Sequence, residues 1–161
     1  MVFRNGSYEG HGYDLWMTPE WLIDGLENEF GLMFDPCPPR WDGSWNGLEI
    51  KWKDVNFVNP PYGDIQRWVE KCHVEAKKGK TIFLLIPNRS CSHYFHDHIL
   101  AYPNLQIVFI SGRVAFTDGR NPNVKPKGAP FPSILCVFNP TEKRIHSIVA
   151  RRIKKVFMCP E

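Results

Sequence analysis

Along most of this chain, segments with continuous apolar runs take turns with segments in which apolar residues recur at helical spacing. Short, nearly continuous apolar runs predict buried strands at residues 32–34, 55–58, 81–86 and 105–110. Apolar residues repeating every three or four positions predict helices at residues 18–30, 64–78 and 92–101. Near the C-terminus the pattern changes to alternation, which predicts an antiparallel hairpin formed by residues 133–138 and 144–150.

The order of these elements predicts the fold class. Strands that alternate with helices indicate an α/β domain of three layers, Rossmann-like, with a mostly parallel sheet and a C-terminal β-hairpin. We expect an N-terminal arm at residues 1–13, a single domain at residues 14–150 and a basic C-terminal tail at residues 151–161. Thr18 is predicted to cap the first helix, with Pro19 as its first residue and Gly31 as its end.

Composition fits one packed domain. The chain has 161 residues, of which 43% are hydrophobic and 14% aromatic, so it is able to bury a substantial core. Its formal net charge of +3 excludes a uniformly basic nucleic-acid-binding surface, but not a local one. Arg144 and residues 151–155 concentrate positive charge, either as a solvated tail or as a phosphate contact. Neither a membrane-span pattern nor a signal region is seen, and we expect a cytoplasmic protein.

The cysteines and histidines do not form a recognisable metal motif. The five cysteines contain no CxxC pair and are odd in number, which fits reduced thiols. A cluster at Cys91, His93, His96 and His98 has no known zinc spacing. We therefore expect no metal site.

The segment Asn59-Pro60-Pro61-Tyr62 follows a predicted buried strand and is suited to binding an amino group on a planar ring. The Asn59 side-chain oxygen and the Pro60 carbonyl are acceptors, and an exocyclic NH2 group has two hydrogens to donate. The two prolines stiffen the loop, and Tyr62 offers a flat face for a base to stack on. A structural Pro-Pro turn with an ordinary packed Tyr is the alternative, but ligands bind at the carboxyl ends of strands in open α/β sheets.

With this loop, four further segments make the chain resemble the phage-type DNA adenine N6-methyltransferases, the phage Dam family. The matching segments run in order from about residue 16 to residue 138. Besides the Asn-Pro-Pro-Tyr loop, they are Trp16-Met17-Thr18-Pro19, Phe34-Asp35-Pro36-Cys37, Gly112-Arg113-Val114-Ala115-Phe116 and Ala129-Pro130-Phe131-Pro132-Ser133. Residues 68–71 resemble the helix behind the catalytic loop.

The resemblance implies a methyltransferase fold, S-adenosylmethionine as the cofactor, adenine in DNA as the substrate and a phage or prophage origin in a bacterial host cytoplasm. It assigns catalysis to Asn59, Pro60, Pro61 and Tyr62. It assigns cofactor binding to Thr18, Pro19, Asp35, Pro36 and Cys37. The expected positive end of the first helix also favours a cofactor carboxylate near Thr18 and Pro19. From local sequence alone, Asp35 is equally explained as a turn residue before proline.

One departure concerns the cofactor. The Gly-rich loop of larger methyltransferases is replaced here by Pro38-Pro39-Arg40-Trp41, so we expect Trp41, Trp45 or Trp52 to cover the adenosine instead. DNA recognition would fall to the loops at residues 36–53 and 117–132. The candidate contacts to DNA are Arg113, Arg120, Lys125 and Lys127.

Two kinds of alternative remain open from the sequence. The same loop would suit methylation of a protein glutamine or of cytosine N4, although for cytosine we expect Ser at position 59. The replaced glycine loop would also suit a non-catalytic nucleic-acid-binding relative.

Overall fold

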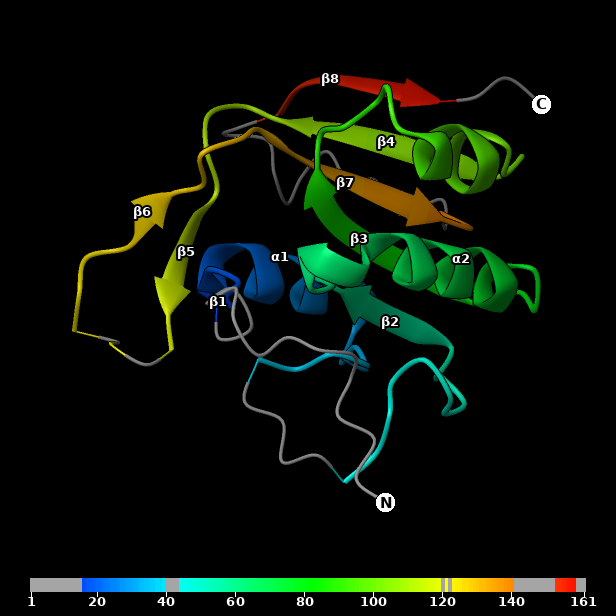
Figure 1. Ribbon diagram of the computed structural model, residues 1–161, viewed down its shortest axis with the longest axis horizontal. Helices are drawn as coiled ribbons and strands as arrows, with labels where there is room; N and C mark the ends of the chain where they lie inside the picture. The colour runs from blue at the N-terminus through cyan, green and yellow to red at the C-terminus, as the bar shows by residue number, and fades with distance from the viewer. Residues whose placement is uncertain (1–15, 40–43, 120, 122, 141–152, 159–161) are drawn as a thin grey trace.

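The central sheet holds the fold together. The computed structural model describes residues 16–39, 44–119, 121 and 123–140, with the backbone alone at Lys127 and at residues 153–158. In that part of the chain the central sheet has five strands in the order β2-β3-β7-β4-β8 (Figure 1). The strands are β2 (Val55–Val58), β3 (Thr81–Pro87), β7 (Ser133–Phe138), β4 (Leu105–Ile110) and β8 (Ile153–Met158).

The prediction of a mostly parallel, Rossmann-like three-layer fold is wrong. Among the five described strands of this sheet, only β2 and β3 pair in parallel, whereas β7 is antiparallel to both β3 and β4, and β8 is antiparallel to β4. The apolar run of β7 is buried along its whole length, and such a run does not reveal the direction of its strand. The chain therefore inserts β7 in the reverse direction between β3 and β4.

The predicted C-terminal hairpin is also not formed as expected. Residues 141–152, which include the predicted second strand, lie outside the described residues. The strand that follows, β8, lies within the segment predicted as a basic tail and pairs with β4 rather than with β7. The strand β7 is consequently an interior strand and not an edge strand.

Other elements cover the sheet or extend from it. The helices are α1 (Glu20–Phe30), the short η1 (Tyr62–Asp64), α2 (Ile65–Ala76) and the π-type helix η2 (Phe95–Leu100). A small second sheet, in the order β1-β5-β6, consists of β1 (Trp16–Met17), β5 (Ala115–Asp118) and β6 (Lys127–Gly128). Figure 1 shows β5 and β6 extending away from the central sheet. No helix in the described ranges is long and apolar enough to cross a membrane.

Alternating side chains of β3 enter two separate hydrophobic clusters. Ile82, Leu84 and Ile86 pack with α2 and η2, whereas Phe83 and Leu85 pack with Leu22 and Leu26 of α1 and with residues of β5 and β7. All seven residues of β3 are buried, as the continuous apolar run predicts.

The predicted helices form with corrected boundaries. The helix α1 ends at Gly31, whose φ of 83° suits glycine, as expected. It begins at Glu20 after Pro19, so Thr18 is not its cap and is available for another contact. The predicted third helix shortens to η2, and the predicted first strand shortens to one parallel bridge between Phe34 and Asn56.

A close backbone contact fixes the turn that follows Phe34. A Cβ added at Gly47 would lie 1.9 Å from the Pro36 carbonyl oxygen and 2.7 Å from the Trp68 ring, so only glycine fits. The Gly47 carbonyl also accepts a 2.7 Å hydrogen bond from the indole nitrogen of buried Trp52. The turn that holds Asp35 and Pro36 is thus packed directly against the α2 core.

We predict that Gly47→Ala lowers the free energy of unfolding by about 1–3 kcal/mol, the usual cost of overpacking a core. Chemical denaturation followed by tryptophan fluorescence would measure the change. Lys51→Ala, at an exposed site on the same loop, is the matched control and should change stability by less than about 0.5 kcal/mol. Equal stability of the two variants would contradict the close contact.

Candidate active site

Three strands of the central sheet end at the same edge. Because β2 and β3 are parallel, and β3 and β4 are both antiparallel to β7, the carboxyl ends of β2, β3 and β4 point the same way. The predicted catalytic loop at residues 59–62 leaves this edge directly after β2. The loops after β3 and β4, and the segment before β7, leave the same edge.

The Asn59 side chain is held by a residue far away in the sequence. Its Nδ2 donates a 3.2 Å hydrogen bond to Thr18 Oγ1, which lies between β1 and α1. This contact fixes the amide so that Oδ1, which has no partner among the described residues, remains available as an acceptor. The sequence placed Thr18 near the cofactor, but the hydrogen bond to Asn59 was not anticipated, since the two residues are 41 positions apart.

The Tyr62 ring is supported by Phe131, a residue distant in the sequence that lies just before β7. Their ring centroids are 5.4 Å apart in an edge-to-face arrangement of 72°. The segment of Phe131 is fixed to the sheet edge, because the Asn88 N–H donates a 2.8 Å hydrogen bond to the Pro132 carbonyl. Burial raises the pKa of Tyr62 to about 12, so its hydroxyl stays protonated at neutral pH.

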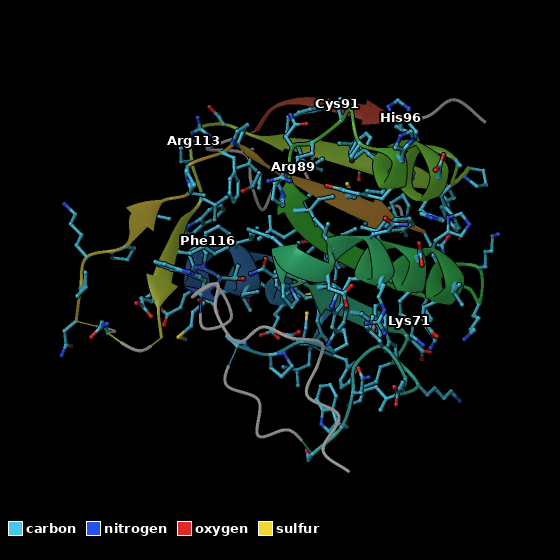
Figure 2. All side chains as sticks on the ribbon, in the orientation of Figure 1. Lys71, Arg89, Cys91, His96, Arg113 and Phe116 are labelled. Carbon is cyan, nitrogen blue, oxygen red and sulfur yellow. The ribbon has the colours of Figure 1, made fainter. Side chains whose placement is uncertain are left out.

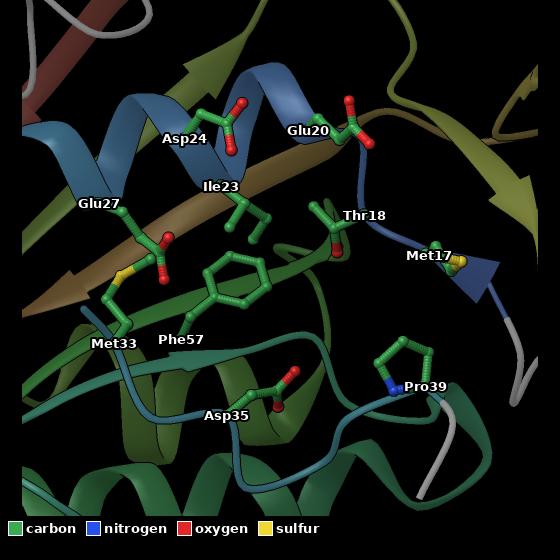
Figure 3. Close-up of a pocket in the computed structure, with 10 residues that line it drawn as sticks. All are labelled: Met17, Thr18, Glu20, Ile23, Asp24, Glu27, Met33, Asp35, Pro39 and Phe57. Carbon is green, nitrogen blue, oxygen red and sulfur yellow. The ribbon is translucent and has the colours of Figure 1, made fainter.

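A pocket of about 280 Å³ lies next to Thr18, the partner of Asn59, between α1 and the segment that contains Asp35 (Figure 3). Its lining combines an apolar floor with carboxylates. The residues that line it are Met17, Thr18, Glu20, Ile23, Asp24, Glu27, Met33, Asp35, Pro39 and Phe57.

The acidic side of the pocket comes mainly from one helix. Glu20, Asp24 and Glu27 are spaced by four and then three residues, which places them on one face of α1. Asp35 faces them from the opposite wall (Figure 3). No described lining residue is basic, so the pocket favours a cationic or hydroxyl-rich ligand. The acidic spacing along α1 is the signal in the sequence from which the three helical carboxylates could have been found.

Asp35 connects the pocket wall to the predicted catalytic loop. Its Oδ1 accepts a 2.8 Å hydrogen bond from the Cys37 N–H. The Cys37 thiol also donates a hydrogen bond to this carboxylate. A backbone hydrogen bond then links Cys37 to Asn59. Burial raises the pKa of Asp35 to about 6, although the hydrogen bonds from Cys37 act in the opposite direction. Burial and the nearby Asp35 charge raise the pKa of Cys37 well above the ordinary thiol value.

The structure separates the predicted cofactor residues into two groups. Thr18 and Asp35 line the pocket, whereas Pro19, Pro36 and Cys37 are not among its lining residues. Trp52 does not cover a ligand, because only 2% of its surface is exposed and it packs in the hydrophobic cluster formed with α2 and η2.

Of the other two candidate tryptophans, the structure describes Trp45, whose ring lies 5.9 Å from the Phe34 ring. Trp41, like Arg40 beside it, lies outside the described residues.

The two predicted DNA contacts whose side chains the structure describes, Arg113 and Lys125, do not line the pocket. Arg113 is exposed three residues after β4, and Lys125 is exposed in the loop between β5 and β6. Arg120 and the side chain of Lys127 fall outside the described residues, as do the side chains of the C-terminal basic segment.

The histidines near Cys91 make separate local contacts. His96 Nε2 lies 2.8 Å from the Ser90 carbonyl oxygen, and His98 Nε2 lies 3.6 Å from Glu70 Oε1. Within the described residues, no group of three or more histidine, cysteine and acidic side chains is placed to hold a metal ion.

Comparison with known proteins gives one finding. A family model described as DNA N-6-adenine-methyltransferase (Dam) matches residues 8–157, nearly the whole chain. Neither the curated proteins nor the solved structures include a significant match.

We predict that Asp35 makes stability depend on pH in an unusual direction. Because its pKa is about 6 in the folded protein against an ordinary value of 3.8, the folded state binds more protons than the unfolded state between these values. Stability from this group therefore falls as pH rises through that window and reaches its lowest level above about pH 7.

Denaturation of the wild type and of Asp35→Asn at pH 5 and pH 7.5 would measure this contribution. The variant should gain stability relative to the wild type at the higher pH, since it has no buried charge to form. A difference between the two proteins that stays constant with pH would mean that Asp35 titrates normally.

Proposed function

The chain belongs to the DNA N-6-adenine-methyltransferase (Dam) family, and on that premise we propose that it transfers a methyl group from S-adenosylmethionine to adenine N6 in DNA, at the loop of residues 59–62. The observation that carries the assignment of the site is the hydrogen bond from Asn59 Nδ2 to Thr18. It makes Asn59 Oδ1 an oriented acceptor next to Thr18, which lines the acidic pocket.

The pocket has the chemistry that such a cofactor requires. S-adenosylmethionine carries a positive sulfonium and a positive ammonium group, and the pocket offers four carboxylates among its described lining residues. Asp35 and the acidic face of α1 would hold these cations and the ribose hydroxyls, and Ile23, Met33 and Phe57 would contact apolar parts. When bound, the cofactor supplies an electrophilic methyl group.

The four carboxylates argue against one detail of the sequence-based expectation. The N-terminus of α1 was expected to favour the cofactor carboxylate near Thr18 and Pro19. The first turn of α1 carries Glu20, which lines the same pocket, and a second carboxylate there would be repelled. We propose that this end of the pocket holds a cationic part of the cofactor.

Asn59 would act on the amino group of the base. Its Oδ1 would accept a hydrogen bond from the N6 amino group and stabilise the positive charge that develops there. That charge would arise as the nitrogen bonds to the methyl group and the methyl–sulfur bond breaks, which would leave a neutral thioether, and N6 would then lose one proton to solvent. Because Thr18 already orients the amide, little reorganisation is needed during the reaction. The Pro60 carbonyl is proposed as the second acceptor, and the rigid Pro60-Pro61 segment keeps the two acceptors together.

Tyr62 would hold the base itself. Adenine must leave the duplex stack to reach the loop, which costs a few kcal/mol, and stacking on an aromatic ring recovers about 1–3 kcal/mol per base. The edge-to-face contact with Phe131 restricts the Tyr62 ring. Tyr62 is half-buried, so part of its surface is open to a base. The neutral hydroxyl of Tyr62 adds no charge beside the reacting nitrogen.

We predict that Asn59→Ala lowers the single-turnover rate of methyl transfer by at least about 100-fold, the scale for losing one preorganised polar group. Cofactor affinity should change little. Asn104→Ala is the matched control, since this exposed asparagine precedes β4 at the opposite edge of the sheet. Near-normal transfer by Asn59→Ala would remove this side chain from the mechanism.

We also predict that Thr18→Val slows transfer by about 5- to 10-fold, as expected when a hydrogen bond of ~1–1.5 kcal/mol no longer orients the amide. Thr18→Ser keeps the hydroxyl and should restore most of the rate, which a purely steric role would not explain. The measurement is the single-turnover rate with cofactor saturating. Equal rates for Val and Ser variants would show that the hydroxyl does not position Asn59.

A further inference from the structure

Two arginines lie at the same edge of the sheet as the candidate active site. Arg89 follows β3 by two residues and Arg113 follows β4 by three, and both side chains are exposed. Figure 2 shows them at the same end of the central sheet. Neither guanidinium forms an ion pair within the described residues, in contrast to Arg67, which lies 2.9 Å from Asp64. Arg89 is not part of any motif recognised in the sequence.

The strand register places the two arginines on either side of the start of β7. Pro87 of β3 pairs with Ser133, and Phe109 of β4 pairs with Ile134, the next residue of β7. The ends of β3 and β4 are therefore level and separated by one intervening strand. At about 4.8 Å between neighbouring strands, the two chain exits are roughly 10 Å apart.

The backbone is held in place both where the chain leaves β3 and where it leaves β4. The Arg89 carbonyl accepts hydrogen bonds from the Ser92 N–H at 2.9 Å and from Ser92 Oγ at 2.8 Å. Gly112, with a φ of 80°, turns the chain into Arg113. A Cβ at Gly128 would lie 2.8 Å from Arg113 Cβ, so β6 packs closely against the base of this side chain. The two positive charges are thus presented from fixed backbone positions.

The aromatic pair of the active site lies beside the same segment. Phe131, which contacts Tyr62, is two residues before Ser133 and so leaves the sheet between the two arginines. The acidic pocket, by contrast, is formed by α1 and Asp35. Positive and negative groups are therefore separated, with the pocket unsuited to phosphate and the β3–β4 edge suited to it.

From this arrangement we propose that Arg89 and Arg113 bind backbone phosphates of the DNA strand that contains the target adenine, one on each side of the segment that carries Phe131. The proposal rests on the function proposed above and adds Arg89 as a positioning residue. Contacts of this kind fix the strand relative to Asn59 and Tyr62 without reading the base sequence.

The test is the salt dependence of DNA binding. Fluorescence anisotropy with a labelled, unmethylated duplex of about 20 base pairs would give the affinity of each variant from 50 to 200 mM salt. Each lost phosphate contact should reduce the slope of log K against log salt by about 0.9. We expect this reduction for Arg89→Gln and for Arg113→Gln, and about 1.8 for the double variant.

Three further variants or readouts make the result decisive. Arg67→Gln, on α2, is the matched control and should leave the slope unchanged. Arg89→Lys keeps the charge and should keep the slope. Cofactor affinity should be the same in all variants, which shows that the pocket is intact. A slope for Arg89→Gln equal to that of Arg67→Gln would overturn the proposal.

The outcome is separable from that of the proposed function. If the wild type makes N6-methyladenine but Arg89→Gln keeps the full slope, only the phosphate contact is wrong. If the wild type binds DNA without transfer, the slopes still decide the contact while the catalytic proposal fails. A wild type that does not bind DNA at all would overturn both.

Discussion

The reversed insertion of β7 between β3 and β4 is the constraint on which the site depends. Since β7 is antiparallel to both neighbours, β3 and β4 must run in the same direction, and β2 is parallel to β3. Three loops therefore leave one edge of the sheet, and the start of β7 delivers Phe131 to that same edge. The burial of every residue of β3 and β7 makes this strand arrangement costly to change.

Charge is distributed around this edge in a way that suits two unlike ligands. The pocket walls of α1 and Asp35 are acidic, and Arg89 and Arg113 provide positive charge at the ends of β3 and β4. Asn59 is adjacent to the pocket through Thr18, and Tyr62 contacts the segment between the arginines. In the proposed function the loop thus lies where a cationic methyl donor and an anionic DNA strand would meet.

The sequence predicted local elements well because hydrophobic periodicity depends on neighbouring residues. The sequence predicted the strands β2, β3, β4 and β7. It also predicted the end of α1 at Gly31 and the buried face of α2. The direction of β7 relative to its neighbours was not predicted, because an apolar run that is buried on both faces has the same pattern in either direction. The mostly parallel sheet was therefore a wrong prediction. The strands β2, β3, β4 and β7 were placed correctly, whereas β8 lies in the segment predicted as a basic tail.

In the candidate site, too, the sequence predicts local features, whereas contacts between distant segments are visible only in the structure. The loop at residues 59–62 could be identified from its chemistry, and the resemblance to the Dam family is confirmed by the match over residues 8–157. Contacts between distant segments, such as Thr18 with Asn59 and Phe131 with Tyr62, needed the structure. The three carboxylates of α1 were present in the sequence as a helical spacing, but only the fold places them opposite Asp35.

The proposed function is tested by incubating the wild-type protein with unmethylated DNA and with S-adenosylmethionine that carries a labelled methyl group. The product nucleosides are then resolved. We expect the label in N6-methyladenine. Label in cytosine, label in protein, or no transfer despite measurable cofactor binding would contradict it.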